Sequence, residues 1–256
     1  NWKIFYLAVV LGLMANGCVS QELFPKTRPL EEIEISGKGN SKILIIEVSG
    51  LLTSSQPNGV IDQLFNRQSL PTRFKEEFSK AAEDEKVKGI VLRINSPGGT
   101  VTASDILHHE ILEFKKTRKI PVVACIMDLG TSGGYYLAAA SDQIVAHPSA
   151  ITGSLGVIML TINGSGLMEK IGLEAHAITS GQHKDMGSPF RKMTAQDRAI
   201  FQSIIESFYQ QFLEIIEQGR PQLTKEKIRQ LADGRIYSAS QAKKAGLIDK
   251  IGYLDD

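Results

Sequence analysis

One short run, Val122 to Met127, constrains the fold of this chain more than any other. It is wholly apolar and partly β-branched, and it leads within a few residues to the sequence GTSGG (residues 130–134) and then to a small-residue helix candidate, Tyr135 to Ala140. Apolar runs of this length are typical of strands buried on both faces of a parallel sheet. The chain is therefore expected to pass from a buried strand into a helix at Ser132.

The same order of strand, turn and helix recurs along the chain. Strands are expected at residues 42–48, 87–94, 143–146 and 175–179, and helices at 71–84, 103–117 and 195–218, with two short helices after residue 224. Apolar strands that alternate with helices indicate an α/β fold, with a parallel sheet and covering helices. The long helix has an apolar stripe that should dock on the sheet or on a neighbouring subunit: Ile200, Ile204, Phe208, Phe212 and Ile215.

Composition excludes several classes of partner. The chain has 29 basic and 28 acidic residues, a net charge of +1, and the basic residues are dispersed. Nucleic acid is therefore not an expected partner. The two cysteines and five histidines show no zinc-ligand spacing, so no metal, and no other cofactor, is expected.

The N-terminal residues predict export. Lys3 precedes an apolar run, Ile4 to Ala15, that is short for a membrane span and fits the apolar region of a secretory signal. Gly17-Cys18 is similar to the end of a lipoprotein signal, and a cleaved signal or an uncleaved anchor are the alternatives. We expect residues 1–20 to be this signal or anchor, 21–41 a polar tether, and 42–256 the folded domain.

Ser132 is the candidate nucleophile. The neighbouring glycines allow a sharp turn, which would place the hydroxyl at a helix N-terminus where the N–H groups near Gly133 can donate to an oxyanion. A Ser-Gly-Gly sequence alone fits a helix N-cap equally well. A second run, NSPGG at 95–99, follows another buried strand, and its glycines remove side chains from the approach of a further backbone donor.

Two residues compete for the role of general base. His147 ends the next expected strand and would form a Ser–His pair. GTSGG also matches the G-x-S-x-G elbow of α/β-hydrolases, yet no histidine follows His183, whereas those enzymes carry theirs late in the chain. Lys184 lies in the polar loop 180–192, and a lysine acts as a base only when desolvation brings its pKa down to roughly 7–8.

Four separated runs favour the lysine. They are NSPGG, TSGGYYLAAASDQIVAHPSAITGSLGV, ITSGQHKDMGSPFRKMT and DGRIYSASQAKKAGLIDKIGYLDD, in that order. From residue 42 onward the chain resembles the short, single-unit bacterial signal peptide peptidase A family, serine-lysine proteases with the fold shared by Clp protease and the crotonases. The resemblance implies Ser132 as nucleophile and Lys184 as base. It further implies oxyanion donors at Gly98 and Gly133 and a hydrogen bond from Ser154 to the lysine amine.

The resemblance also implies a function. It implies a membrane-associated serine endopeptidase, with its catalytic domain on the extracytoplasmic side of the cytoplasmic membrane, that degrades remnant signal peptides and other apolar peptides through an acyl-enzyme. It implies a homo-oligomeric ring or dome in which Ser132 of one subunit meets Lys184 of its neighbour. The alternatives are a crotonase-like acyl-CoA enzyme and an inactive membrane scaffold on the same fold.

Overall fold

A parallel sheet forms the centre of the protein, whose computed structural model describes residues 30–55 and 68–256. The expected signal or anchor (residues 1–20) and residues 21–29 of the expected tether lie outside these ranges. The main strands are β1 (Lys42–Ser49), β2 (Val87–Ser96), β3 (Val122–Thr131), β4 (Gln143–Ala146) and β7 (Lys250–Ile251), in the order β1-β2-β3-β4-β7. Every pairing along this order is parallel. The expected α/β fold with a parallel sheet is confirmed.

β1 lies at the edge of this sheet. The run at 42–48 was expected to be a buried strand, yet β1 pairs only with β2 and has no partner strand on its other side among the described residues. Its Ile43 side chain is 64% exposed. Apolar composition alone does not distinguish an edge strand from a central one, because both can bury one face.

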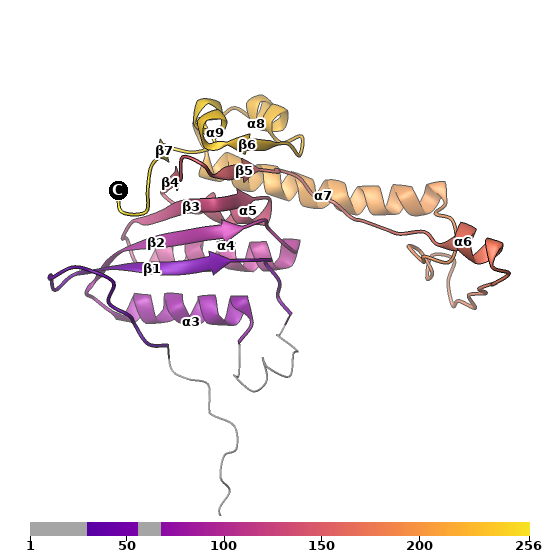
Figure 1. The fold of residues 1–256 in the computed structure, drawn as a ribbon, viewed down its shortest axis with the longest axis horizontal. Coiled ribbons are helices and arrows are strands. Elements are labelled where there is room, and N and C mark those ends of the chain that lie inside the picture. Colours follow the sequence, from indigo (N-terminus) through magenta and orange to yellow (C-terminus); the bar gives the residue numbers. More distant parts are fainter. Residues whose placement is uncertain (1–29, 56–67) are drawn as a thin grey trace, which may run out of the picture.

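Three helices follow the strands and cover the buried face of the sheet (Figure 1): α3 (Leu70–Glu83), α4 (Val101–Thr117) and α5 (Gly133–Ala138). Parallel neighbours require such crossovers. The N-terminus of α3 is capped by Ser69 and that of α4 by Thr100, each of which accepts from a backbone N–H in the first turn. The helices expected at 71–84 and 103–117 are confirmed, and their apolar stripes supply fully buried side chains such as Phe74 and Leu107.

β3 changes its partner along its length, and this change positions the candidate site. Val123 to Ile126 pair with β4, whereas Leu129 to Thr131 pair with β5 (Ile151–Gly153). β5 is in turn held on its other side by β6 (Ile236–Ser238), which runs antiparallel. The end of β5 therefore lies beside the end of β3, where the chain enters α5.

Two short helices close the chain, as expected: α8 (Lys225–Leu231) and α9 (Ala239–Ala245). They bury Ile228, Leu231 and Ala242 in the same core as the sheet. Within the described ranges no helix is both long enough and apolar enough to cross a lipid bilayer.

One part of the chain projects away from this core (Figure 1). We call it the arm: residues 157–194, which include α6 (Ser165–Lys170), together with the N-terminal half of α7 (Ala195–Gly219). No residue of α6 is buried. The arm carries many apolar side chains that are more than half exposed: Ile158, Leu160, Ile162, Leu167, Ile171, Leu173, Ile178 and Phe190.

The apolar stripe of α7 divides between core and arm. Phe212 is buried and Ile215 packs against the core, whereas Ile204 and Phe208, nearer the start of the helix, are 37% and 38% exposed. Docking on the core is therefore confirmed for the C-terminal half of the stripe only. The N-terminal half of the stripe, with Ile204 and Phe208, lies outside the buried core.

The prediction of a strand at 175–179 is wrong. These residues form no strand, and Ile178 is fully exposed. The short alternation of apolar and polar residues resembles a half-buried strand, but the segment lies in the arm, where it pairs with no other strand of the described chain. A strand requires a neighbour for its backbone groups, and local pattern cannot supply one.

Candidate active site

Ser132 sits at a strained turn between β3 and α5. Its φ is 51° and its ψ is −119°. Among the described residues, only Ser132 and Ser154 combine a side chain with a positive φ, which costs on the order of 1–3 kcal/mol each. The turn is held by its neighbours: the Ser132 N–H donates to Gly153 O at 2.8 Å, and its carbonyl accepts from the N–H groups of Tyr135 and Tyr136, both at 2.9 Å.

The strained turn distinguishes a nucleophile from a helix cap. A capping serine adopts an extended backbone and accepts a hydrogen bond from the first turn of its helix. Ser132 does neither, since its side chain makes no capping hydrogen bond to α5. A serine exposed at a sharp turn from strand to helix is instead the arrangement of a nucleophile elbow.

The turn after β2 packs directly against Ser132. A Cβ added at Gly98 would lie 2.8 Å from the Ser132 Cβ and 2.7 Å from the Gly133 nitrogen. One added at Gly133 would lie 2.2 Å from the Ser104 hydroxyl oxygen. The structure therefore brings NSPGG and the Ser132 turn together, and their glycines make this approach possible.

The backbone donors in this turn are not equivalent. The N–H of Gly98 already donates to Ser96 Oγ at 3.1 Å. The Gly98 carbonyl and the Thr100 N–H both bond to Leu52, at 2.9 and 2.8 Å. These two bonds form a parallel bridge between Leu52 and Gly99, in which the Gly99 N–H itself takes no part. A Cβ on Gly133 would lie 3.3 Å from the Gly99 nitrogen.

Two N–H groups therefore remain free beside Ser132. Within the described part of the chain, neither the Gly99 nor the Gly133 N–H has an acceptor. Sequence reasoning assigned one oxyanion donor to Gly98, and the hydrogen bond to Ser96 makes Gly99 the better candidate. The sequence offers no signal for this choice, because it depends on the contact between Gly99 and Leu52, which are far apart in the chain.

Ser154 lies beside Ser132, at the end of the adjacent strand. Thr131 pairs with Gly153, so each serine comes one residue after a paired position. The Ser154 N–H donates to Arg235 O at 2.7 Å, and the residue is half-buried, as is Ser132. The structure thus brings together two strained serines at the ends of neighbouring parallel strands.

Lys184 does not reach this group within one chain. It is exposed, in the loop between α6 and α7. Figure 1 shows that this loop lies at the far end of α7 from α5. α5 contacts α7 at Gln211, through Tyr136, so the start of α7 at Ala195 lies 16 residues from that contact, roughly 24 Å at the rise of an α-helix. The expected nucleophile and the expected base are therefore not brought together within one chain.

His147, the competing base, is also remote from Ser132. Its N–H donates to Ile126 O at 2.8 Å, which places it beside a residue six positions before Ser132 in β3, roughly 20 Å away at the rise of a strand. Its Nδ1 lies 2.8 Å from the Ser149 hydroxyl, and its ring packs edge-on against Tyr253 at 5.0 Å. Within the described part of the chain, Ser132 and His147 therefore do not form a pair.

Comparison with known proteins gives a family match and several relatives. The model of peptidase family S49 matches residues 114–256. The chain is 37% identical over 227 residues to "Putative signal peptide peptidase SppA" of Enterococcus faecium, covering 88% of this chain and 64% of that protein. It is 35% identical over 177 residues to "Protease 4" of Haemophilus influenzae (69% of this chain, 28% of that protein). It is 31% identical over 222 residues to "Serine protease SPPA, chloroplastic" of Arabidopsis thaliana (84% and 31%). The chain thus spans less than two thirds of the length of these relatives.

Proposed function

Because this chain belongs to peptidase family S49, we propose that it is a serine endopeptidase in which Ser132 forms an acyl-enzyme. The observation that carries this proposal is the strained turn at Ser132, with the free N–H groups of Gly99 and Gly133 beside it. An oxyanion needs two such donors close to the attacked carbon, and their energetic effect is large because they are fixed before the reaction.

The chemistry follows from these groups. The Ser132 oxygen attacks the carbonyl carbon of the scissile peptide bond as its proton passes to the amine of Lys184, and the carbonyl oxygen becomes an oxyanion held by Gly99 and Gly133. The intermediate collapses, the C–N bond breaks, and the leaving amine takes the proton from the lysine. Water then adds to the acyl-enzyme by the same route and releases the acid. Ser154, at the end of the strand next to Ser132, is proposed to orient the lysine amine.

We propose that Lys184 is supplied by a second copy of the chain. Within one chain it does not reach Ser132, while the arm that carries it has eight apolar side chains that are more than half exposed, and apolar side chains gathered on a surface mark interaction sites. If the arm packs on the next subunit around a closed ring, these apolar side chains become buried and Lys184 approaches the Ser132 turn of that subunit. The same ring would keep folded proteins away from the site.

The proposed substrates are apolar peptides, including remnant signal peptides. Support comes from the name of the Enterococcus faecium relative and from the apolar side chains of the arm. We further propose that the protein is membrane-associated, with its catalytic domain on the extracytoplasmic side. Support for this comes from the sequence of residues 1–20, which lie outside the described structure.

A fluorophosphonate probe tests the nucleophile. The probe should label Ser132 in the wild-type protein and fail to label Ser132→Ala, as read by mass spectrometry of the modified peptide. Ser132→Ala and Lys184→Ala should each lose nearly all activity on a fluorogenic apolar peptide. Full activity in either variant would contradict the Ser–Lys mechanism, and an unlabelled wild-type protein would favour the acyl-CoA or scaffold alternatives.

A mixing experiment tests the shared site. Ser132→Ala and Lys184→Ala subunits are each inactive, but mixed assemblies contain interfaces at which an intact Ser132 meets an intact Lys184. Part of the activity should therefore return after mixing. Mixed assemblies that are verified by native mass spectrometry and remain inactive would place both residues of the site in one chain.

A further inference from the structure

The loop that carries Lys184 is held by three charged side chains, which we call the arm cluster: Asp185, Arg191 and Asp197. Arg191 donates from Nε and Nη2 to the two oxygens of Asp185, at 2.7 and 2.9 Å. Its remaining nitrogen, Nη1, donates to Oδ2 of Asp197 at 2.6 Å. The forked contact fixes the orientation of both partners, which a single hydrogen bond would not.

Asp197 anchors the cluster to α7. Its side chain is only 2% exposed. It forms a capping box with Thr194, in which each residue accepts from the backbone N–H of the other at 3.0 Å. The nearest nitrogen of His183 is 3.8 Å from Asp197, so both sequence neighbours of Lys184 contact the arm cluster. Hydrogen bonds from Arg191 hold the pKa values of Asp185 and Asp197 below their usual range, so both carboxylates stay ionised near neutral pH.

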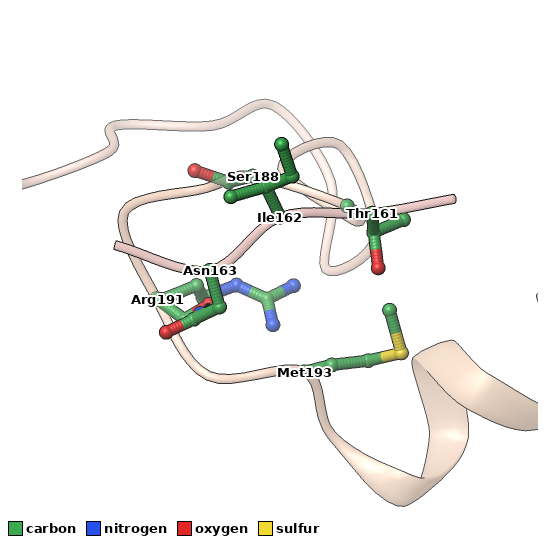
Figure 2. Close-up of a pocket in the computed structure, with 7 residues that line it drawn as sticks. Thr161, Ile162, Asn163, Ser188, Arg191 and Met193 are labelled. Carbon is green, nitrogen blue, oxygen red and sulfur yellow. Dashed lines mark hydrogen bonds between the residues drawn. The ribbon is translucent and has the colours of Figure 1, made fainter. Parts of the chain in front are cut away.

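The backbone around Lys184 is also constrained. The Lys184 N–H donates to Gly181 O and the Ser188 N–H to Asp185 O, at 3.1 and 3.0 Å. The other side of the loop packs on residues 161–163, which carry no charge. Between them is a cavity of about 20 Å³, with room for about one water, in which Arg191 is the only charged lining residue (Figure 2).

We propose that Arg191 is a positioning residue for Lys184, holding the loop of the base in a fixed place relative to the start of α7. This inference rests on the proposed Ser–Lys peptidase. α7 is a continuous helix whose C-terminal half is packed in the core through Phe212 and Ile216. The arm cluster joins the other end of this rigid element to the residues on either side of Lys184. Arg191 therefore fixes where Lys184 lies relative to the rigid helix α7.

Substitution of Arg191 in the otherwise unchanged protein is the first test. Arg191→Met should lower kcat by about 10- to 100-fold, because a base displaced by about 1 Å loses that much rate. Arg191→Lys keeps the charge but not the fork, and should lie between Arg191→Met and the wild type. KM should change by less than about twofold, since substrate binding is not involved. The matched control is Arg198→Met, whose exposed side chain makes no ion pair within the described chain.

The second test uses subunit mixing to separate positioning from general support of the fold. In a mixture of Ser132→Ala and Lys184→Ala chains, the Ser132→Ala chain supplies the working lysine. Arg191→Met should lower the restored activity when it is placed on that chain. It should have little effect when placed on the Lys184→Ala chain. The two mixtures contain the same substitutions overall, so a loss of stability or of assembly would affect both alike.

The two tests separate a failure of the Arg191 role from a failure of the shared Ser–Lys site. Equal losses in the two mixtures, or a wild-type kcat in Arg191→Met, would overturn the positioning role. Failure of the parent mixture to regain activity would contradict the shared site instead. The kcat of Arg191→Met in the unmixed protein then decides the inference, with a loss of at least about tenfold supporting it.

Discussion

The two parts of the proposed site are held in place in different ways. Ser132 is fixed by the core: its turn is enclosed by β3, β5 and the glycines of the NSPGG turn, all at contact distance. Lys184 is fixed by the arm, through ion pairs and a few backbone hydrogen bonds around an exposed loop. The nucleophile needs a strained backbone, which only dense packing can impose, whereas the base needs a surface that a second subunit can still approach.

Matched truncations of a phenylalanine should show the largest difference between core and arm. Phe74 is fully buried and packs against Phe78 at a centroid distance of 4.7 Å, so Phe74→Ala should lower the free energy of unfolding by about 3–5 kcal/mol. Phe208 is 38% exposed, and Phe208→Ala should cost less than about 1 kcal/mol within one chain. Urea unfolding followed by circular dichroism measures both.

Protein concentration sharpens this comparison. If the arm packs on a second copy, the effect of Phe208→Ala on unfolding should depend on protein concentration, whereas the effect of Phe74→Ala should not. Equal effects of the two substitutions at every concentration would show that the arm is part of the core in a single chain.

The oxyanion turn should show the next largest effect. A Cβ at Gly99 would lie 1.9 Å from Leu52 O, so Gly99→Ala must shift the backbone that carries the proposed donor. kcat/KM should fall by about 10²- to 10³-fold, as for the loss of an oxyanion donor. The control is Gly166→Ala in the arm, where an added Cβ meets nothing within 4 Å. A folded Gly99→Ala enzyme with near wild-type activity would remove Gly99 from the site.

The elements of the core could be predicted from sequence because their signals are local. Periodicity predicts α3 and α4, and runs rich in apolar residues predict β2 and β3, since each element buries a face that its own residues define. The same reasoning failed at residues 175–179. Whether those residues pair depends on a neighbour, and in the arm the described chain provides none.

The site was predictable in part, for the same reason. Ser132 and the NSPGG turn are recognisable from short motifs, and the structure places them together. The choice between Gly98 and Gly99 depends on the contact with Leu52, and the separation of Lys184 from Ser132 depends on the direction of α7. Neither is a property of local sequence. The arm cluster was missed because Asp185, Arg191 and Asp197 are ordinary charged residues whose spacing gives no signal.

As the pH is lowered, the stability contributed by the core should fall at a higher pH than the stability contributed by the arm cluster. Burial against Tyr136 lowers the pKa of His108 to about 4, below the ordinary value of 6.5. Between these values the unfolded chain binds the proton more readily, so stability is fully present above about pH 6.5 and falls by up to about 3 kcal/mol toward pH 4. Asp185 and Asp197 have lowered pKa values, so their contribution is lost only below the ordinary aspartate range.

Unfolding measured at several pH values checks this order. His108→Phe should flatten the decline between pH 6.5 and pH 4, because no proton is then taken up at this position. Asp185→Asn, in the arm, should leave the decline in that interval unchanged. A decline that persists in His108→Phe would assign it to other groups and remove this distinction between core and arm.

The smallest predicted effect compares two helix caps of the same type. Thr194 caps α7 in the arm and Thr224 caps α8 in the core, and each accepts from a backbone N–H, at 3.0 and 3.2 Å. Replacing either by alanine should cost about 1 kcal/mol. Thr194→Ala should also speed hydrogen exchange near residues 183–198 and lower kcat severalfold, because the Thr194 hydroxyl accepts from the Asp197 N–H and Asp197 in turn holds Arg191. Thr224→Ala should leave kcat unchanged. Equal kcat values in the two variants would show that the start of α7 does not position Lys184, and would confine the control of activity to the core.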